Sequence, residues 1–427
     1  MFKKVVSLSS VAVLPILIST SALAQSDTPI PSAPSPYQLT GTSISGSRSA
    51  SQGILSAPVP VGATAYKTES GVYIYPTAFL AYGYDDNVTL AATGQIQSSF
   101  VHFVPEMVAE LKNKGDRYTA KVNLDSTRYM SSADDNADAS LLEFAGDNYF
   151  SSRARVGWAL ARVNGFDPRG SNDRVISAEP DKWHSNNING RFIYGAQEAS
   201  GRFEFDLGHQ VKTYDNNREN TAIADLTLDS FAGRFYYRLG TRTLALFEYR
   251  DAKANYASDL STESNTEHRY YAGLTWEATA NTTGIVKVGR MTKDFESAGT
   301  QGTSDGSWEA AIRWTPRTFT QVDLQTSRST ADSTGFGDYR LLTSTNLVWQ
   351  QKWTKSLGSS ISAGVLGTIY GGTGRVDNAV NFGFKVDYAV LRWLQIGLDF
   401  ARVDNSSNDA AAAYKRNLTA LTLTATL

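Results

Sequence analysis

The chain has 427 residues, and 40 Lys and Arg against 42 Asp and Glu give it a formal charge of −2. This balance provides no basic face for nucleic acid, and the lack of Cys excludes a disulfide-stapled fold and disfavours a structural zinc site. Hydrophobic residues make up 41%, less than the roughly 45–50% of soluble globular proteins, yet the chain holds 21 Tyr, 19 Phe and 8 Trp. This composition suits a large membrane barrel with a wet interior and aromatic rims.

Residues 1–24 are a predicted secretory signal peptide. Lys3 and Lys4 open it, an apolar stretch runs from Val5 to Ile18, and small residues end it at Ala24. Removal of the two lysines leaves 40 − 2 = 38 basic against 42 acidic residues, a formal charge of −4. The apolar stretch is too short for a good membrane-spanning helix, and no other segment approaches the about 18 apolar residues that a span needs. The sequence therefore predicts an exported protein without helical spans.

Residues 25–70 differ in composition from the rest of the chain. Six prolines, from Pro29 to Pro60, stand among Ser, Thr, Ala and Gly. Such a segment cannot bury enough apolar surface to fold alone, so we expect a flexible, disordered periplasmic lead-in. Two roles stay open. The segment is either an inert linker, or it enters the lumen or docks on a periplasmic partner.

From Gly71 onward the chain reads as a series of β-strands with alternating side chains. In the run 382–390, Phe, Phe, Val, Tyr and Val alternate with Gly, Lys, Asp and Ala. The chain ends on YKRNLTALTLTATL, with Leu on one face and Thr on the other, and its last residue is Leu427 where such barrels commonly carry an aromatic residue. This alternation is typical of a strand between lipid and a polar lumen. An amphipathic strand of a soluble β-sandwich is the alternative.

Short and long connections alternate along this series. Short links such as Lys112–Gly115 alternate with longer polar ones such as Phe166–Asp181, the pattern of periplasmic turns and external loops. We predict an all-β fold over residues 71–427, a transmembrane antiparallel up-and-down β-barrel of about 18 strands. The number is 16 if the runs Leu141–Tyr149 and Val156–Asn164 are not strands. An even number places both termini in the periplasm, with the barrel in the outer membrane of a Gram-negative bacterium.

Two further features concern strand ends and strand interiors. Pro105 falls inside a predicted strand, where it removes a ladder hydrogen bond and predicts a β-bulge. Tryptophans fall at strand ends, as expected of aromatic girdles at the two membrane interfaces. Four of them lie beside predicted short turns and two at opposite strand ends, namely Trp276, Trp314, Trp353 and Trp393, and Trp183 and Trp308.

The sequence offers little for catalysis. None of the four histidines is spaced as a metal pair or marked by a nucleophile: His102, His184, His209 and His268. GGTGR at 371–375 lacks the strand–loop–helix order of a phosphate loop. The paired acids Asp85–Asp86 offer Ca²⁺ ligands, although acidic external loops are more often simply solvated. We therefore predict no catalytic residue, no metal and no cofactor.

Function is expected in the lumen, because the wall predicted by alternation carries both signs of charge. Arg binds carboxylates and phosphates bidentately, and tyrosines such as Tyr236 and Tyr271 offer faces to sugar rings, which suits passage of a polar glycan, acidic ones included. The alternative is that these charges pair across strands and only keep the lumen hydrated and rigid. The predicted lumen-lining cations are Lys121, Arg153, Arg155, Lys212, Arg234, Arg238, Arg250, Lys287, Arg313 and Lys385, and the anions are Asp125, Glu204, Asp206, Glu248, Glu277, Glu309, Asp323, Asp387 and Asp399.

Several segments carry a family resemblance. The first strand YPTAFLAYGYDDNV (Tyr75–Val88) ends in Tyr-Asp-Asp-Asn, and Pro105 follows in the second strand. YYAGLTWEATANTTGIVKVGRMTKDF (Tyr270–Phe295) and SWEAAIRWTPRTFTQVDL (Ser307–Leu324) form two successive hairpins, and YKRNLTALTLTATL closes the chain. Over Gly71–Leu427 the chain resembles the putative β-barrel porin 2 family, in particular its members associated with exopolysaccharide biosynthesis and export.

The resemblance implies an outer-membrane barrel that exports an extracellular or capsular polysaccharide by passive translocation through a charged, hydrated lumen gated by external loops. It implies outer-membrane lipid, the secreted polysaccharide and a periplasmic polysaccharide export protein as partners, and no nucleic acid. The first alternative is a general diffusion porin for small solutes, for which an inward fold of the loop Phe166–Asp181 would be informative. The others are an outer-membrane enzyme and a structural barrel plugged by residues 25–70.

Overall fold

The computed structural model describes residues 54–57 and 65–426, except residues 172, 197, 280 and 334. Residues 1–53, with the predicted signal peptide and most of the lead-in, lie outside the described residues. One short strand, β1 (Tyr66–Lys67), precedes the barrel and pairs with the first two residues of β2. Short helical segments occur in three of the connections: η2 (Ala133–Asp135), α1 (Arg218–Thr221) with η3 (Ala222–Ala224), and η4 (Ala410–Ala412). None of the helices in the described part of the chain is long and apolar enough to cross a membrane.

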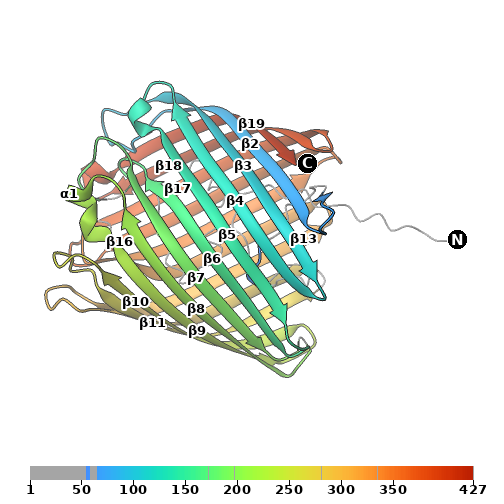
Figure 1. The fold of residues 1–427 in the computed structure, drawn as a ribbon. Helices are drawn as coiled ribbons and strands as arrows, with labels where there is room; N and C mark the ends of the chain where they lie inside the picture. Colours follow the sequence, from blue (N-terminus) through green and yellow to red (C-terminus); the bar gives the residue numbers. More distant parts are fainter. Residues whose placement is uncertain are drawn as a thin grey trace.

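Strands β2 to β19 form one closed antiparallel barrel in which each strand pairs with its neighbours in the chain (Figure 1). The predicted 18-stranded fold is confirmed, and the two runs in doubt are strands β5 and β6. The strands are β2 (Tyr73–Asp85), β3 (Ser98–Asn113), β4 (Asp116–Tyr129), β5 (Ala137–Tyr149), β6 (Ala154–Asp167), β7 (Asp181–Tyr194), β8 (Gly201–Tyr214), β9 (Leu226–Arg238), β10 (Thr243–Tyr256), β11 (Asn265–Thr279), β12 (Thr282–Phe295), β13 (Thr303–Arg317), β14 (Thr320–Asp332), β15 (Tyr339–Lys352), β16 (Leu357–Tyr370), β17 (Val376–Leu391), β18 (Leu394–Ser407) and β19 (Tyr414–Thr426).

The two ends of the barrel differ. Eight short turns, such as residues 114–115 between β3 and β4, join strands at the end where β2 begins and β19 finishes. We call this the turn end. Nine connections, most of them longer, lie at the opposite end, among them residues 86–97, 168–180 and 257–264. We call this the loop end.

Side chains alternate between the outer face and the lumen, as the sequence pattern predicts. On β2, Leu80 and Tyr82 are exposed on the outside, whereas Phe79 and Ala81 are buried on the inside. On β19, Leu421 is exposed and Thr422 is buried. Apolar side chains therefore cover the outside of the barrel and polar ones line much of its interior.

Two sequence expectations require correction. Trp183 does not belong to an outer girdle, because its indole Nε1 donates to the lumen-facing Asp167 at 3.0 Å and Lys212 Nζ lies 4.3 Å from its ring centroid. Pro105 causes no bulge. It pairs in register with Ala78 of β2, and β3 pairs with β4 in one register on both sides of the proline. The missing N–H interrupts the ladder locally without an inserted residue.

The barrel closes where β19 meets β2. The ladder there runs from Leu418 against Asp85 to Thr426 against Thr77. Two contacts on the lumen side reinforce it. Arg416 forms a buried, charge-assisted pair with Asp85, and Phe79, Phe100 and Leu418 belong to one apolar cluster beside the seam. Side-chain contacts thus add to the backbone hydrogen bonds that close the barrel.

Candidate functional site

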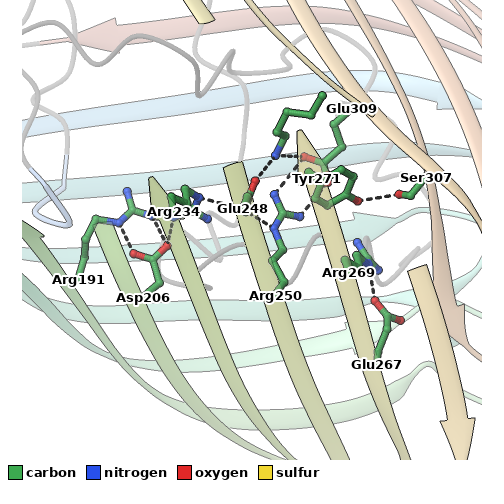
Figure 2. Close-up of polar contacts among 11 residues, drawn as sticks. Arg191, Asp206, Arg234, Glu248, Arg250, Glu267, Arg269, Tyr271, Ser307 and Glu309 are labelled. Carbon is green, nitrogen blue, oxygen red and sulfur yellow. Dashed lines mark hydrogen bonds and ion pairs between the residues drawn. The ribbon is translucent and has the colours of Figure 1, made fainter. Parts of the chain in front are cut away.

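A row of ion pairs crosses the lumen wall roughly at right angles to the strands (Figure 2). Asp206 accepts from Arg191 Nε at 2.5 Å and from Arg234 Nη1 at 2.5 Å. Arg234 Nε also contacts Glu248 at 2.7 Å, so that one guanidinium links two carboxylates on β8 and β10. Antiparallel register places these residues side by side, since Arg191 lies opposite Asp206 and Arg234 opposite Glu248.

Glu248 is the centre from which the row continues to β13. Its Oε1 accepts from Arg250 Nε at 2.7 Å and its Oε2 from Lys287 Nζ at 2.8 Å. Glu309 receives both cations, from Arg250 Nη1 at 2.8 Å and from Lys287 Nζ at 2.5 Å. We call these seven residues the charge row: Arg191, Asp206, Arg234, Glu248, Arg250, Lys287 and Glu309.

The charge row is nearly balanced and carries an aromatic face. Its four cations and three carboxylates contact one another directly, so their fields largely cancel a few ångströms from the wall. The Tyr271 ring lies beside it, 5.2 Å from the Arg250 guanidinium and 5.0 Å from Lys287 Nζ, and its hydroxyl is 2.7 Å from Ser307 Oγ. The side chains of Asp206, Arg234, Glu248, Arg250 and Lys287 are 5% exposed or less, and Tyr271 is also buried. The row is therefore a packed, paired part of the wall without a strong field of one sign.

The other predicted lumen-lining residues form separate pairs or lie near the ends. Arg313 pairs with Asp323 at 2.8 Å, Lys385 contacts Asp387 at 3.3 Å and Asp399 at 3.6 Å, and Lys121 contacts Glu106 at 3.0 Å. Arg155 and Arg238 donate to backbone carbonyls at the turn end. Charge pairing across strands, which the sequence left as the alternative, thus describes much of the wall.

Two predicted residues do not fit this description, and some contributing residues were missed. Arg153 lies in the turn between β5 and β6 and is exposed, so its assignment to a strand was wrong. The side chain of Glu277 lies outside the described residues. Arg191 was missed, although it alternates on β7 with Asn187 and Asn189, which are buried on the lumen side.

The connection between β6 and β7, residues 168–180, crosses the loop end, and we call it the strap. Arg169 donates from Nε to Asp135 at 2.7 Å beside the start of the strap. Further along, Asp173 accepts from Arg375 Nη1 at 2.7 Å. Arg375 precedes β17, and in the barrel order eight strands separate β7 from β16 in either direction. The Asp173–Arg375 pair therefore joins nearly opposite sides of the rim.

Two glycines allow the strap to approach its neighbours closely. Gly170 has φ +74°, and a Cβ added to it would lie 2.0 Å from the carbonyl oxygen of Thr89. Gly335 has φ +119°, and a Cβ there would lie 2.8 Å from the backbone nitrogen of Arg174. Other residues are strained in this left-handed region. The strap is therefore packed by backbone contact as well as by ion pairs.

The carboxyl group of Glu263, in the connection between β10 and β11 at the loop end, has a raised pKa. Burial raises the pKa of its carboxyl to about 7, and the charges of Asp332 and Asp338 add to the rise. A backbone hydrogen bond from Ser333 and the ammonium of Lys293 oppose it. The pKa of Glu263 in the folded protein lies above the ordinary 4.5. The stability that the protonated Glu263 carboxyl contributes is therefore complete below about pH 4.5 and is lost as the pH rises through about 7.

Glu263→Gln is therefore expected to unfold at higher urea concentration than the wild type at pH 8, and at about the same concentration at pH 4. The free energy of unfolding at pH 8 should rise by about 2 kcal/mol. Each unit between the folded and unfolded pKa corresponds to about 1.4 kcal/mol, and relaxation of the loop around the charged carboxylate reduces the total. Urea unfolding of the refolded barrel, followed by tryptophan fluorescence, measures it. Exposed Glu296→Gln is the control, and a gain independent of pH would contradict the assignment.

A described part of the lead-in lies inside the barrel. Residues Ile54–Ala57, which we call the anchor peptide, contact lumen-facing side chains of β4 to β7 near the turn end. For these four residues the structure differs from the expected flexible periplasmic segment, because their polar groups and apolar side chains both have partners on the wall.

The four histidines lie in two settings. His102 faces the lumen and its Nε2 is 2.7 Å from Asp125 Oδ1. His184, His209 and His268 each contact an aspartate at 2.6 to 2.7 Å, and they are half-buried or exposed on the outer side of the alternation. The histidines therefore do not converge on one place in the lumen.

Comparison with known proteins gives one family and several similar folds. The model of the putative β-barrel porin 2 family matches residues 68–427, and the comparison with curated proteins found no match. Among solved structures, OccK9 (OpdG) of Pseudomonas aeruginosa is 12% identical, with 85% of this chain and 100% of that chain covered and a TM-score of 0.49. OccK2 (OpdF) of the same organism, in complex with glucuronate, is 10% identical, with the same coverage and a TM-score of 0.48. A bacterial polysaccharide outer membrane secretin is 9% identical, with 82% and 98% covered and a TM-score of 0.38.

Proposed function

We propose that this chain, which belongs to the putative β-barrel porin 2 family and is an outer-membrane β-barrel of the porin type, forms the pore through which an extracellular polysaccharide leaves the cell. The polymer would pass the lumen without a chemical step on the protein, driven by its synthesis behind it. The solute class is a hydroxyl-rich chain of low charge density. The strap at the loop end would move aside during passage.

The charge row is the observation that carries this proposal. A wall on which acids and bases stood apart would create a field across the pore and would favour small charged solutes. Here Arg234, Arg250 and Lys287 contact Asp206, Glu248 and Glu309 directly. These charges are paired and buried, so a long uncharged chain meets no deep electrostatic trap along such a wall and can slide.

The orientation in the membrane follows from the unlike ends and forms part of the proposal. Porin-type barrels carry short turns on the periplasmic side, so the turn end and both termini would face the periplasm. Exposed basic side chains lie in five of the eight short turns in the described residues, namely Lys114, Arg153, Arg242, Lys355 and Arg392. This basic rim suits an acidic surface of a periplasmic polysaccharide export protein, or the headgroups of the inner leaflet.

A general diffusion pore for small solutes is the second candidate, and the strap favours it. A segment fixed across the mouth by Arg169–Asp135 and Arg375–Asp173 narrows the exit for a polymer more than for a monosaccharide. In that case the strap would be a permanent constriction. The two functions therefore differ in whether the strap moves.

Single-channel conductance of the refolded barrel in a planar bilayer, with glycans added on the turn side, tests the proposal. We expect stepwise blocks by long neutral glycans, no block by monosaccharides, and a cation-to-anion permeability ratio near unity because the wall charges are paired. Deletion of the gene should abolish the surface polysaccharide. Conductance indifferent to polymer, together with unchanged surface polysaccharide, would favour the general diffusion pore.

A further inference from the structure

The anchor peptide has polar partners that match its backbone. Asp147, fully buried on β5, accepts from the backbone nitrogen of Leu55 at 2.7 Å, from that of Ser56 at 3.3 Å and from the Ser56 hydroxyl. Thr119 Oγ1 accepts from the backbone nitrogen of Ala57 at 2.9 Å. Three consecutive backbone N–H groups are therefore satisfied by two side chains of the wall, one of them charged.

Arg117 completes the polar part of the contact from the other side. It donates from Nη1 to Ser56 Oγ at 2.6 Å and from Nη2 to the Ala57 carbonyl at 2.6 Å. Its Nε donates to Glu110 Oε1 at 2.6 Å, and Glu110 also accepts from the Tyr75 hydroxyl at 3.1 Å. Glu110 thus orients the guanidinium toward the peptide.

The apolar side chains of the peptide are also accommodated. Ile54 and Leu55 cluster with Ala145, Ala159 and Ile193 of β5, β6 and β7. Ala57 clusters with Tyr75 of β2 and Val108 of β3. The peptide consequently runs around the inner wall across six neighbouring strands.

Gly157 of β6 provides the space that Ile54 occupies. A Cβ added there would lie 2.6 Å from Ile54 Cγ2 and 2.8 Å from Ile54 Cβ. The wall is therefore shaped to the side chain as well as charged to suit the backbone. A larger side chain at residue 157 would compete with the peptide for the same place.

We propose that the inner wall of β2 to β7 is a peptide-binding site whose ligand is the chain's own Ile54–Ala57, and that the bound peptide occupies the lumen at the turn end. The ligand class is an extended segment of two branched apolar residues, a hydroxyl residue and a small residue. This inference requires only that the lumen is a pore and does not depend on which solute passes. A solute would have to share the turn end of the lumen with the peptide, or displace it.

Thiol accessibility in the full chain tests the site directly, because the chain contains no Cys. Ala57→Cys introduces a thiol where the side chain is 2% exposed and makes only apolar contacts in its cluster. Thr354→Cys, exposed in the turn between β15 and β16, is the matched control. In outer-membrane fragments we expect a membrane-impermeant maleimide to label residue 57 at least about tenfold more slowly than residue 354.

Two variants release the peptide by different routes. Asp147→Ala removes the shared acceptor and Gly157→Leu fills the Ile54 site, and each should raise labelling of the Ala57→Cys thiol to near the control rate. Each should also increase single-channel conductance, whichever solute is exported. Heat-modifiable gel migration shows that the variants fold. Labelling of residue 57 at the control rate in the otherwise unaltered chain, or slow labelling that neither variant changes, would overturn the proposal.

Discussion

Asp173→Cys combined with Arg375→Cys, linked by a bis-maleimide whose spacer contains a disulfide, is expected to keep the pore closed until a reductant is added. The two side chains lie in contact across the mouth, with Arg375 Nη1 2.7 Å from Asp173 Oδ1. An arginine side chain reaches farther than a direct disulfide, whose Cα atoms lie within about 7 Å of each other, so the cross-linker takes the place of the ion pair and makes the contact between opposite sides of the rim covalent. Since the chain has no other Cys, single-channel recording before and after reduction measures the effect. Most of the conductance should return on reduction.

The matched control is the same reducible cross-link at a pair that does not cross the mouth. Arg128 and Asp138 form an exposed pair at 2.8 Å between the adjacent strands β4 and β5. Arg128→Cys with Asp138→Cys should leave conductance unchanged under either condition. If the Asp173–Arg375 variant conducts equally before and after reduction although its cross-link has formed, the strap is not a gate, and a fixed constriction becomes the better description.

Glu248→Gln is expected to destabilise the barrel by about 3 kcal/mol and to make the pore anion-selective. Glu248 neutralises Arg234, Arg250 and Lys287 at 2.7 to 2.8 Å. Loss of one member of a buried pair typically costs about 3–5 kcal/mol, because the remaining charge is uncompensated. The lower end applies here, since Arg234 keeps Asp206 as a partner and Arg250 and Lys287 keep Glu309. Urea unfolding and the reversal potential in a salt gradient measure the two effects.

Asp323→Asn is the control for this experiment. Asp323 pairs with one cation, Arg313, whose side chain is 39% exposed, so its loss should cost less than about 1 kcal/mol. The reversal potential should also move less, because a single partly solvated cation is freed. Equal effects of the two substitutions would show that the charge row has no special role in the wall.

Much of the barrel is predictable from sequence because a strand between lipid and water has a strict period of two. The alternation in residues 382–390 and 394–400 places Lys385 and Asp399 on the polar face. Both lie on the lumen side in the structure, where Lys385 Nζ is 3.6 Å from Asp399 Oδ2. Connection lengths gave the strand number and identified the charged loop that became the strap. These features depend on local sequence alone.

The remaining features depend on distant parts of the chain. Asp173 and Arg375 are 202 residues apart, and nothing in either loop identifies the other. Entry of the lead-in into the lumen was one of the roles left open, but the residues that bind the wall were not predicted. Ile54-Leu55-Ser56-Ala57 lies in a Pro- and Ser-rich segment, and its partners become visible only when β4 to β7 are side by side. Trp183 was misplaced because alternation separates two faces of a strand without showing which face meets lipid. Its hydrogen bond to Asp167 places Trp183 on the lumen side.

The seam between the first and last barrel strands has a consequence for biogenesis. Arg416 and Asp85 are 331 residues apart, so the closing ladder forms the longest loop in the chain and carries a large entropic penalty before any contact forms. An incomplete chain ending before Leu418 would present two open strand edges, which are sites of aggregation. The barrel therefore cannot close until β19 is available, however much of the preceding sheet has formed. A single truncation of the last strand should cause degradation of the whole polypeptide.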